Sequence, residues 1–216
     1  MTTPAPRRGL NEAVTRFWSW AAPAYDTGFL QRWVYQPAQD EIIAQLRAHK
    51  PDKVADVACG TGILADRIAR ELQPEDVYGV DMSDGMLAQA RARSAGVNWL
   101  TGPAEQLPFE DAALDAVVTS SAFHFFDQPA ALREFYRVLT PGGLLAVTTM
   151  SPRHPIPFSR LLGGRWSPAH LPRPAELRAL FEGAGFTISD QHRVRRPAWG
   201  MFVSDMLTVG IKPDEL

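Results

Sequence analysis

The sequence predicts an α/β protein whose core is a doubly wound, mainly parallel sheet of seven strands with one antiparallel edge strand. Three observations lead to this prediction. Short apolar runs alternate with amphipathic helical segments along most of the chain, which is typical of a parallel sheet covered by helices. The first run leads into a glycine-rich turn, "VADVACGTG" at residues 54–62. The last two runs have no convincing helix between them, which favours an antiparallel strand at the sheet edge.

The expected elements follow in chain order. Seven segments have a β-type apolar pattern: 53–57, 77–80, 98–100, 114–119, 144–150, 186–194 and 199–210. Five segments have helical periodicity, with Ser83 or Asp84 capping the third and the "PGG" motif stopping the fourth: 36–49, 61–72, 83–95, 128–140 and 174–186. We expect residues 1–35 to form a flexible N-terminus and lid. Residues 151–173 hold five prolines and two glycines and are expected to form a substrate loop.

Composition limits the possible functions. The 216 residues predict a single domain, 1–216, and the net charge of −2 gives no electrostatic case for binding nucleic acid. Cys59 is the one cysteine, so an internal disulfide framework and a Cys-based zinc cluster are excluded, and a cytoplasmic protein is expected. No apolar run approaches about 18 residues, so no membrane span is predicted. We expect a monomer or homodimer.

The turn after the first strand predicts a ligand site. Gly60 and Gly62 allow close approach of a ligand to the backbone, and Asp81 ends the next strand, where an acid can bind both ribose hydroxyls. The stretch "GTGILA" also matches the dinucleotide fingerprint. Asp56 separates the two interpretations: its carboxylate would repel a pyrophosphate and attract an ammonium or sulfonium group, both of which S-adenosylmethionine (SAM) carries. The alternative is that Asp56 merely caps the turn.

Four motifs in order resemble those of the class I SAM-dependent methyltransferases, in the branch that includes the ubiquinone/menaquinone-biosynthesis enzymes. They are "VADVACGTG", "VYGVDMSDGMLAQAR", "GPAEQLPFEDAALDAVVTSSAFHFF" and "LREFYRVLTPGGLLAV". The resemblance covers residues 14–150 well and 174–190 more weakly. The commoner form of the first motif has glycine where this chain has Ala58. The resemblance implies a Rossmann-like fold, SAM as cofactor and S-adenosylhomocysteine (SAH) as product.

The resemblance also implies roles for individual residues. Asp81 would bind the ribose, Met82 and Met86 would flank the adenine, and Ser120 would lie by the methionine moiety. Tyr25, in "FWSWAAPAYD", would donate to the SAM carboxylate or simply pack the lid. The implied cofactor-binding set is Tyr25, Asp56, Ala58, Cys59, Gly60, Gly62, Asp81, Met82, Met86, Ala104, Glu105 and Ser120.

The sequence says less about the methyl acceptor and the residues that would bind it. His124 follows the fourth strand and is the candidate general base, because histidine titrates near neutral pH; the alternative is a packed loop residue. Asp127 more simply caps the next helix. Together with His154 and His170 it could hold a divalent metal, although no spacing motif supports one. We expect methyl transfer to a small-molecule hydroxyl, on a sugar, oligosaccharide or lipid-like acceptor. A C-methyltransferase on a quinone-type ring and a non-catalytic SAM-binding domain are the alternatives.

Overall fold

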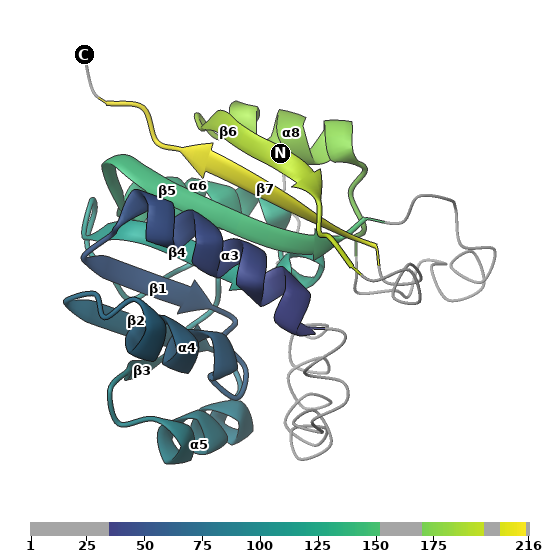
Figure 1. Cartoon of the computed structure of the whole chain (residues 1–216). Helices are drawn as coiled ribbons and strands as arrows, with labels where there is room; N and C mark the ends of the chain where they lie inside the picture. Colours follow the sequence, from purple (N-terminus) through teal and green to yellow (C-terminus); the bar gives the residue numbers. More distant parts are fainter. Residues whose placement is uncertain (1–34, 152–169, 197–203, 215–216) are drawn as a thin grey trace, which may run out of the picture.

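The computed structural model describes residues 35–151, 170–196 and 204–214. Within them, one sheet has the strand order β3-β2-β1-β4-β5-β7-β6 (Figure 1). Its strands are β1 Lys53–Val57, β2 Asp76–Asp81, β3 Asn98–Thr101, β4 Leu114–Ser120, β5 Leu139–Met150, β6 Thr187–Arg193 and β7 Asp205–Ile211. The first five run parallel, and β7 runs antiparallel to both β5 and β6. The predicted fold class is therefore confirmed.

The position of the antiparallel strand differs from the prediction. β7 lies between β5 and β6, so the edge is formed by β6. The missing helix between the last two strands correctly indicated that they pair with each other. It carried no information about which of the two would pair with β5, because that choice depends on packing against the sheet.

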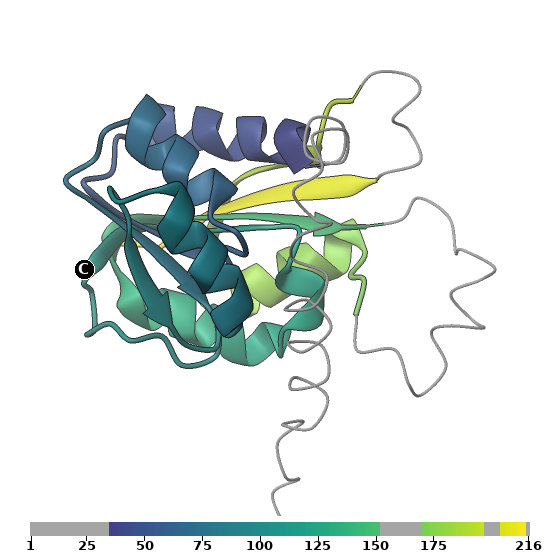
Figure 2. The same cartoon turned by 90° about the horizontal axis from the view of Figure 1, so that it is seen from below.

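Helices cover both faces of the sheet. They are α3 Gln36–His49, α4 Ile63–Glu71, α5 Asp84–Arg93, α6 Gln128–Val138 and α8 Pro174–Gly183. Apolar side chains of α3 and α4 pack into one buried cluster, and those of α6 and α8 pack into a second cluster on the opposite face. The two helical layers are visible on either side of the sheet in Figure 2. Among the elements described, α3, α4, α6 and α8 pack on the faces of the sheet, and the connecting loops begin at the carboxyl ends of the parallel strands.

Several helices and strands begin or end at other residues than predicted, for local reasons. The helix predicted over 61–72 begins at Ile63, because Gly62 adopts a left-handed φ of 79° and serves as its N-cap. β5 begins at Leu139 and includes the "PGG" motif, which was expected to stop the preceding helix and to come before a strand that begins at residue 144. A single 3-10 turn at Phe123–Phe125, labelled η2, was not predicted.

Two predicted segments lie wholly or mostly outside the described residues. They are the lid at 1–35 and the loop at 151–173; Tyr25 and His154 are among the residues concerned. Among the residues that the structure does describe, no helix has the length and apolar character needed to cross a membrane.

Candidate cofactor site

A pocket lies at the carboxyl ends of β1 and β4, where the glycine-rich turn leads into α4. It is a partly open pocket with a cavity volume of about 30 Å³, and about 360 Å³ when the adjoining open solvent is included. Its lining residues are Tyr35, Gln39, Asp56, Ala58, Cys59, Gly60, Thr61, Ile63, Leu64 and Ser120. Five of these were predicted from the sequence: Asp56, Ala58, Cys59, Gly60 and Ser120. None of the lining residues carries a positive charge.

Asp56 is the one acidic side chain among the described lining residues. It is the penultimate residue of β1 and only 2% exposed. Its carboxyl accepts a hydrogen bond from the backbone of Ala65, in the first turn of α4, while Oδ2 has no partner among the described residues. Burial and the neighbouring charge of Asp81 raise the pKa of Asp56 to about 8. Asp56 is therefore mostly protonated near neutral pH, and a positively charged ligand would stabilise its ionised form.

Asp81, the last residue of β2, ties the glycine-rich turn to the next loop. Its Oδ2 accepts from the backbone N–H of Gly60 at 2.9 Å, and its Oδ1 accepts from Ser83 at 2.8 Å. Burial raises the pKa of Asp81, and the backbone hydrogen bonds act in the opposite direction. Each carboxylate oxygen can accept more than one hydrogen bond. The side chain can thus hold the turn and still bind a pair of ligand hydroxyls.

The two glycines of the turn have different roles. A Cβ on Gly60 would meet no atom within 4 Å, so this backbone faces open space at the pocket. A Cβ on Gly62 would lie 2.3 Å from the ring of Trp99, and Gly62 does not line the pocket. Gly62 lets the turn pack against Trp99 on β3, instead of providing the close ligand approach expected from the sequence. Ala58 adopts a left-handed φ of 56°, a conformation that favours the glycine of the commoner motif.

Asp81 and the remaining predicted cofactor residues in the described part of the chain lie outside the pocket lining, and Tyr25 is not among the described residues. Met82 is 41% exposed, and Met86 is buried at the start of α5, where its N–H donates to the cap Ser83. Ala104 belongs to the core, and Glu105 accepts from the backbone N–H of Asp127 at 2.9 Å. Their contacts with a cofactor stay a prediction.

The sequence reasoning missed five lining residues: Thr61, Ile63 and Leu64 at the predicted turn, and Tyr35 and Gln39, which α3 and its N-terminus bring to the pocket. Gln39 is 7% exposed and its Oε1 accepts from Arg67 at 3.3 Å. It precedes the buried Ile42 and Ile43 by three and four residues. A polar side chain on the apolar stripe of an amphipathic helix was the available signal.

The structure places His124 in an environment that does not favour a general base. It lies in η2, is only 5% exposed and does not line the pocket. Its Nδ1 lies 3.4 Å from Oγ1 of Thr149, and burial lowers the pKa of the imidazole to about 4. These are properties of a packed, neutral histidine, the alternative that the sequence left open, and the role of His124 as a base stays a prediction.

The other acceptor-side candidates also have local partners. Asp127 caps α6 by accepting from Ala130 at 3.2 Å, as the simpler prediction had it. His170 pairs with Glu176 at 2.8 Å. Within the described ranges, no three His, Cys, Asp or Glu side chains gather closely enough to hold a metal ion.

The pocket fits a cofactor that carries positive charge and a ribose. The buried Asp56 oxygen without a partner, and the neighbouring carboxylate of Asp81, favour cations and disfavour a pyrophosphate. The open face of Gly60 admits a ligand close to the backbone. SAM combines an ammonium group, a sulfonium and a ribose diol, so the residues present fit it.

Comparison with known proteins agrees with this fit. The family described as "Methyltransferase domain" matches residues 55–147. The demethylmenaquinone methyltransferase of Thermus thermophilus is 36% identical over 166 residues, covering 64% of this chain and 76% of that protein. The malonyl-[acyl-carrier protein] O-methyltransferase of Serratia marcescens is 37% identical over 142 residues, and the alignment spans 65% of this chain but only 53% of that enzyme.

A solved structure shows the same fold. A Haloferax volcanii protein, determined in complex with the Trm112 methyltransferase activator, superposes with a TM-score of 0.76 at 24% identity, covering 91% of this chain and 97% of that one. Together with the sequence matches, the fold and pocket define the class: this chain belongs to the class I SAM-dependent methyltransferases.

Proposed function

We propose that this chain transfers the methyl group of SAM to an oxygen of a small-molecule acceptor. The observation that carries the proposal is the pair of acids at the glycine-rich turn: the buried Asp56, whose Oδ2 has no partner among the described residues, and Asp81, which accepts from the N–H of Gly60. Asp56 would hold the positively charged end of SAM, and Asp81 would hold its ribose.

Methyl transfer from SAM requires little from the protein beyond alignment of the donor and the acceptor. SAM supplies a methyl group already activated by a sulfonium leaving group. The residues of this chain therefore act by binding and orienting the donor and by excluding water from the pocket. An oxygen acceptor also needs a group to take its proton, unless it is already ionised. His124 stays the predicted base; a His124→Gln variant with unchanged turnover would remove it from that role.

A second acceptor class competes with the first. The Thermus relative is a demethylmenaquinone methyltransferase, whereas the Serratia relative is an O-methyltransferase. We favour oxygen because hydroxyl side chains gather at the carboxyl ends of β4 and β5: Ser120 lines the pocket, and Thr119, Thr148, Thr149 and Ser151 are buried behind it. A site for a quinone ring would instead favour an apolar lining. We also propose that residues 1–216 form a single domain, in which residues 1–35 act as a lid and residues 151–173 act as the substrate loop.

Titration calorimetry with SAM and, separately, with NADH tests the cofactor. Binding of SAM alone supports the proposal, and binding of NADH alone contradicts it. A chain that binds SAM is then given labelled SAM with sugars, malonyl thioesters and demethylmenaquinone. Label on a sugar or carboxylate oxygen supports the oxygen acceptor. Label on the quinone ring favours the second class, and saturable SAM binding without transfer to any acceptor favours a non-catalytic domain.

A further inference from the structure

The connection between β3 and β4 runs along α6 and is held to it at both ends. It starts at the carboxyl end of β3, where Gly102 donates its N–H to the backbone oxygen of Asp81 at 3.2 Å. At the N-terminus of α6, the backbone N–H of Asp127 donates to Glu105. At the other end of α6, Ala112 and Ala113 donate their N–H groups to the oxygens of Arg137 and Val138, both at 2.9 Å.

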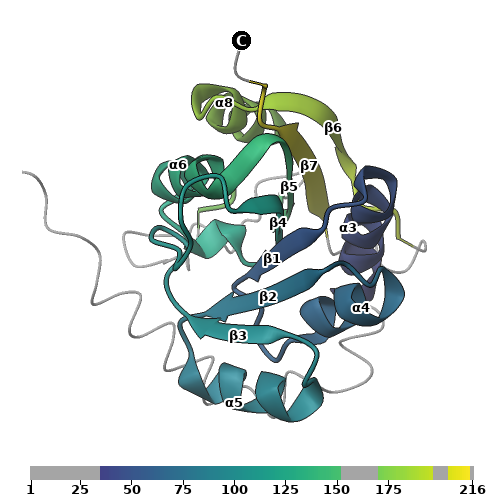
Figure 3. The same cartoon turned by 90° about the vertical axis from the view of Figure 1, so that its left-hand side faces the viewer.

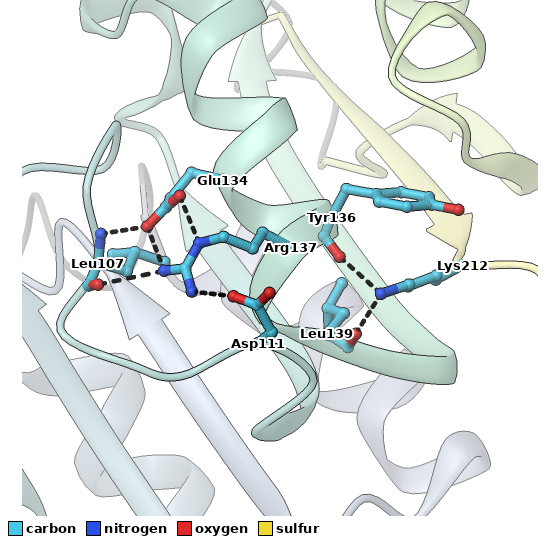
Figure 4. Close-up of polar contacts among 7 residues, drawn as sticks. All are labelled: Leu107, Asp111, Glu134, Tyr136, Arg137, Leu139 and Lys212. Carbon is cyan, nitrogen blue, oxygen red and sulfur yellow. Dashed lines mark hydrogen bonds and ion pairs between the residues drawn. The ribbon is translucent and has the colours of Figure 1, made fainter.

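Side chains of α6 hold the middle of this connection (Figure 4). Oε1 of Glu134 accepts from the backbone N–H of Leu107 at 2.7 Å and also accepts from Arg137. The Arg137 guanidinium donates to the backbone oxygen of Leu107 at 3.4 Å and to Asp111 at 2.7 Å. Both polar groups of one loop residue, Leu107, are thus held by one helical pair. We call Glu134, Arg137 and Asp111 the α6 clamp.

The clamp is mostly sheltered from water on the helix side. The side chain of Glu134 is 13% exposed and that of Arg137 is 34% exposed, whereas Asp111 is 81% exposed. The hydrogen bond and charge of Arg137 lower the pKa of Glu134, so the acid is ionised near neutral pH. A partly buried, charge-assisted bond to a loop N–H is stronger than a neutral one. Glu134 is therefore the member whose loss should release the loop most.

Strand order indicates which end of the ligand this loop would meet. Asp56 lies on β1, Asp81 lies on β2, and the loop begins after β3. A ligand with its cationic end at Asp56 and its ribose at Asp81 would extend its base toward the end of β3. Residues 102–107 lie in that direction, and they include the buried Ala104 and Leu107.

We propose that Glu134 is a positioning residue, which sets the affinity of the cofactor site for the adenosine half of its ligand by fixing residues 102–107. The proposal rests on the proposed function, because it assumes an adenosine-containing cofactor at Asp81. Glu134 does not touch the ligand and acts through Leu107 alone.

The test uses the full chain with Glu134→Ala and Glu134→Gln. Glu182→Gln on α8 is the matched control, because Glu182 also pairs with an arginine, Arg178, but on an exposed surface. Hydrogen exchange at the Leu107 amide reports the clamp. Calorimetry with SAM, SAH and 5′-methylthioadenosine, which has adenosine but no amino acid, reports the site. Thermal unfolding checks the fold.

For Glu134→Ala we expect faster Leu107 exchange and about tenfold weaker binding of all three ligands, the order of one charged hydrogen bond. Glu134→Gln keeps an acceptor for Leu107 and should lose about threefold. The control should match the wild type. If Glu134→Ala does not fold, the Gln variant decides alone: faster exchange with weaker binding supports the proposal, and unchanged affinity overturns it.

Two further outcomes overturn it. Faster exchange with unchanged affinities would mean that the clamp holds the loop but does not position the ligand. Weaker binding of SAM with unchanged binding of 5′-methylthioadenosine would place the effect outside the adenosine half. If the wild type binds none of the three ligands, the proposed cofactor is overturned as well. If the wild type and Glu134→Ala bind the ligands equally tightly, only this inference is overturned.

Discussion

Polar groups are hydrogen-bonded differently at the two ends of the parallel strands. We call the end where these strands begin the amino edge and the end where they finish the carboxyl edge. At the amino edge, Asp115 accepts from Lys53 N–H at 2.9 Å, and Lys212 donates to the oxygens of Tyr136 and Leu139 at 3.0 and 2.7 Å (Figure 4). At the carboxyl edge, four buried oxygens have no partner among the described residues: Asp56 Oδ2, Thr119 Oγ1, Ser151 Oγ and Asp205 Oδ1. Figure 3 shows the sheet and its layers from the side.

This difference separates stability from binding. Buried polar groups are normally hydrogen-bonded, because an unpaired one costs about 1–3 kcal/mol. The amino edge follows that rule, so its polar groups contribute to the fold. The carboxyl edge departs from it, and Asp56, the one of these four residues that lines the pocket, regains a partner if a ligand supplies one. Mutations at the two edges should therefore change different quantities.

Asp81→Ala should give the largest change. Loss of its carboxylate removes both the acceptor for ligand hydroxyls and the hydrogen bonds to Gly60 and Ser83. We expect SAM affinity to fall by at least about 100-fold, the order of two hydrogen bonds to a charged group. Calorimetry measures it, and a wild-type affinity would show that Asp81 is not at the ligand.

Lys212→Met should give the opposite pattern at the amino edge. Methionine keeps the length of the side chain but leaves the oxygens of Tyr136 and Leu139 without their donor, and the contact over the Tyr136 ring is lost. We expect a loss of about 2–3 kcal/mol in the free energy of unfolding and no change in SAM affinity. Denaturant unfolding and calorimetry check the two halves, and a large loss of affinity with intact stability would erase the distinction between the edges.

Asp56→Asn should move stability and affinity in opposite directions. The folded pKa of Asp56 is about 8, above the ordinary value of 3.8, so its contribution to stability is present at low pH and is lost as pH rises toward 8. Relative to the wild type without cofactor, the variant should gain stability between pH 4 and 8, by at least about 1 kcal/mol at pH 8.

The same substitution should weaken SAM binding by about tenfold, because the neutral amide no longer attracts a cation. Melting curves at several pH values and calorimetry at pH 8 provide the measurements. Equal pH dependence in both proteins would mean that Asp56 is ionised throughout and already has a partner.

Ala58→Gly should give the smallest change. The left-handed backbone of Ala58 costs an L-residue about 1–2 kcal/mol, which glycine avoids, while glycine adds chain entropy to the unfolded state. We expect a net stabilisation of up to about 1 kcal/mol, measured by denaturant unfolding, with SAM affinity within about twofold. A clear destabilisation would show that the Ala58 methyl group makes contacts that outweigh the strain.

Local signals in the sequence were enough for most elements and for half of the site. The alternation of apolar runs and helices predicted the strands, and glycines with an acid before and after them located the pocket at Asp56 and Gly60. These features depend on near neighbours in the chain, where periodicity and turn chemistry act. The resemblance of four motifs predicted the family on the same basis.

Other features depend on segments that are distant in sequence. The placement of β7 between β5 and β6, the packing of Gly62 under Trp99 and the burial of His124 each depend on contacts across the fold. No spacing in the sequence indicates that Glu134 meets Leu107, 27 residues earlier. The sequence by itself determined the elements, the glycine-rich turn and the cofactor class. Tertiary structure decided which side chains reach the pocket, because burial and charge pairing exist only once the layers have packed.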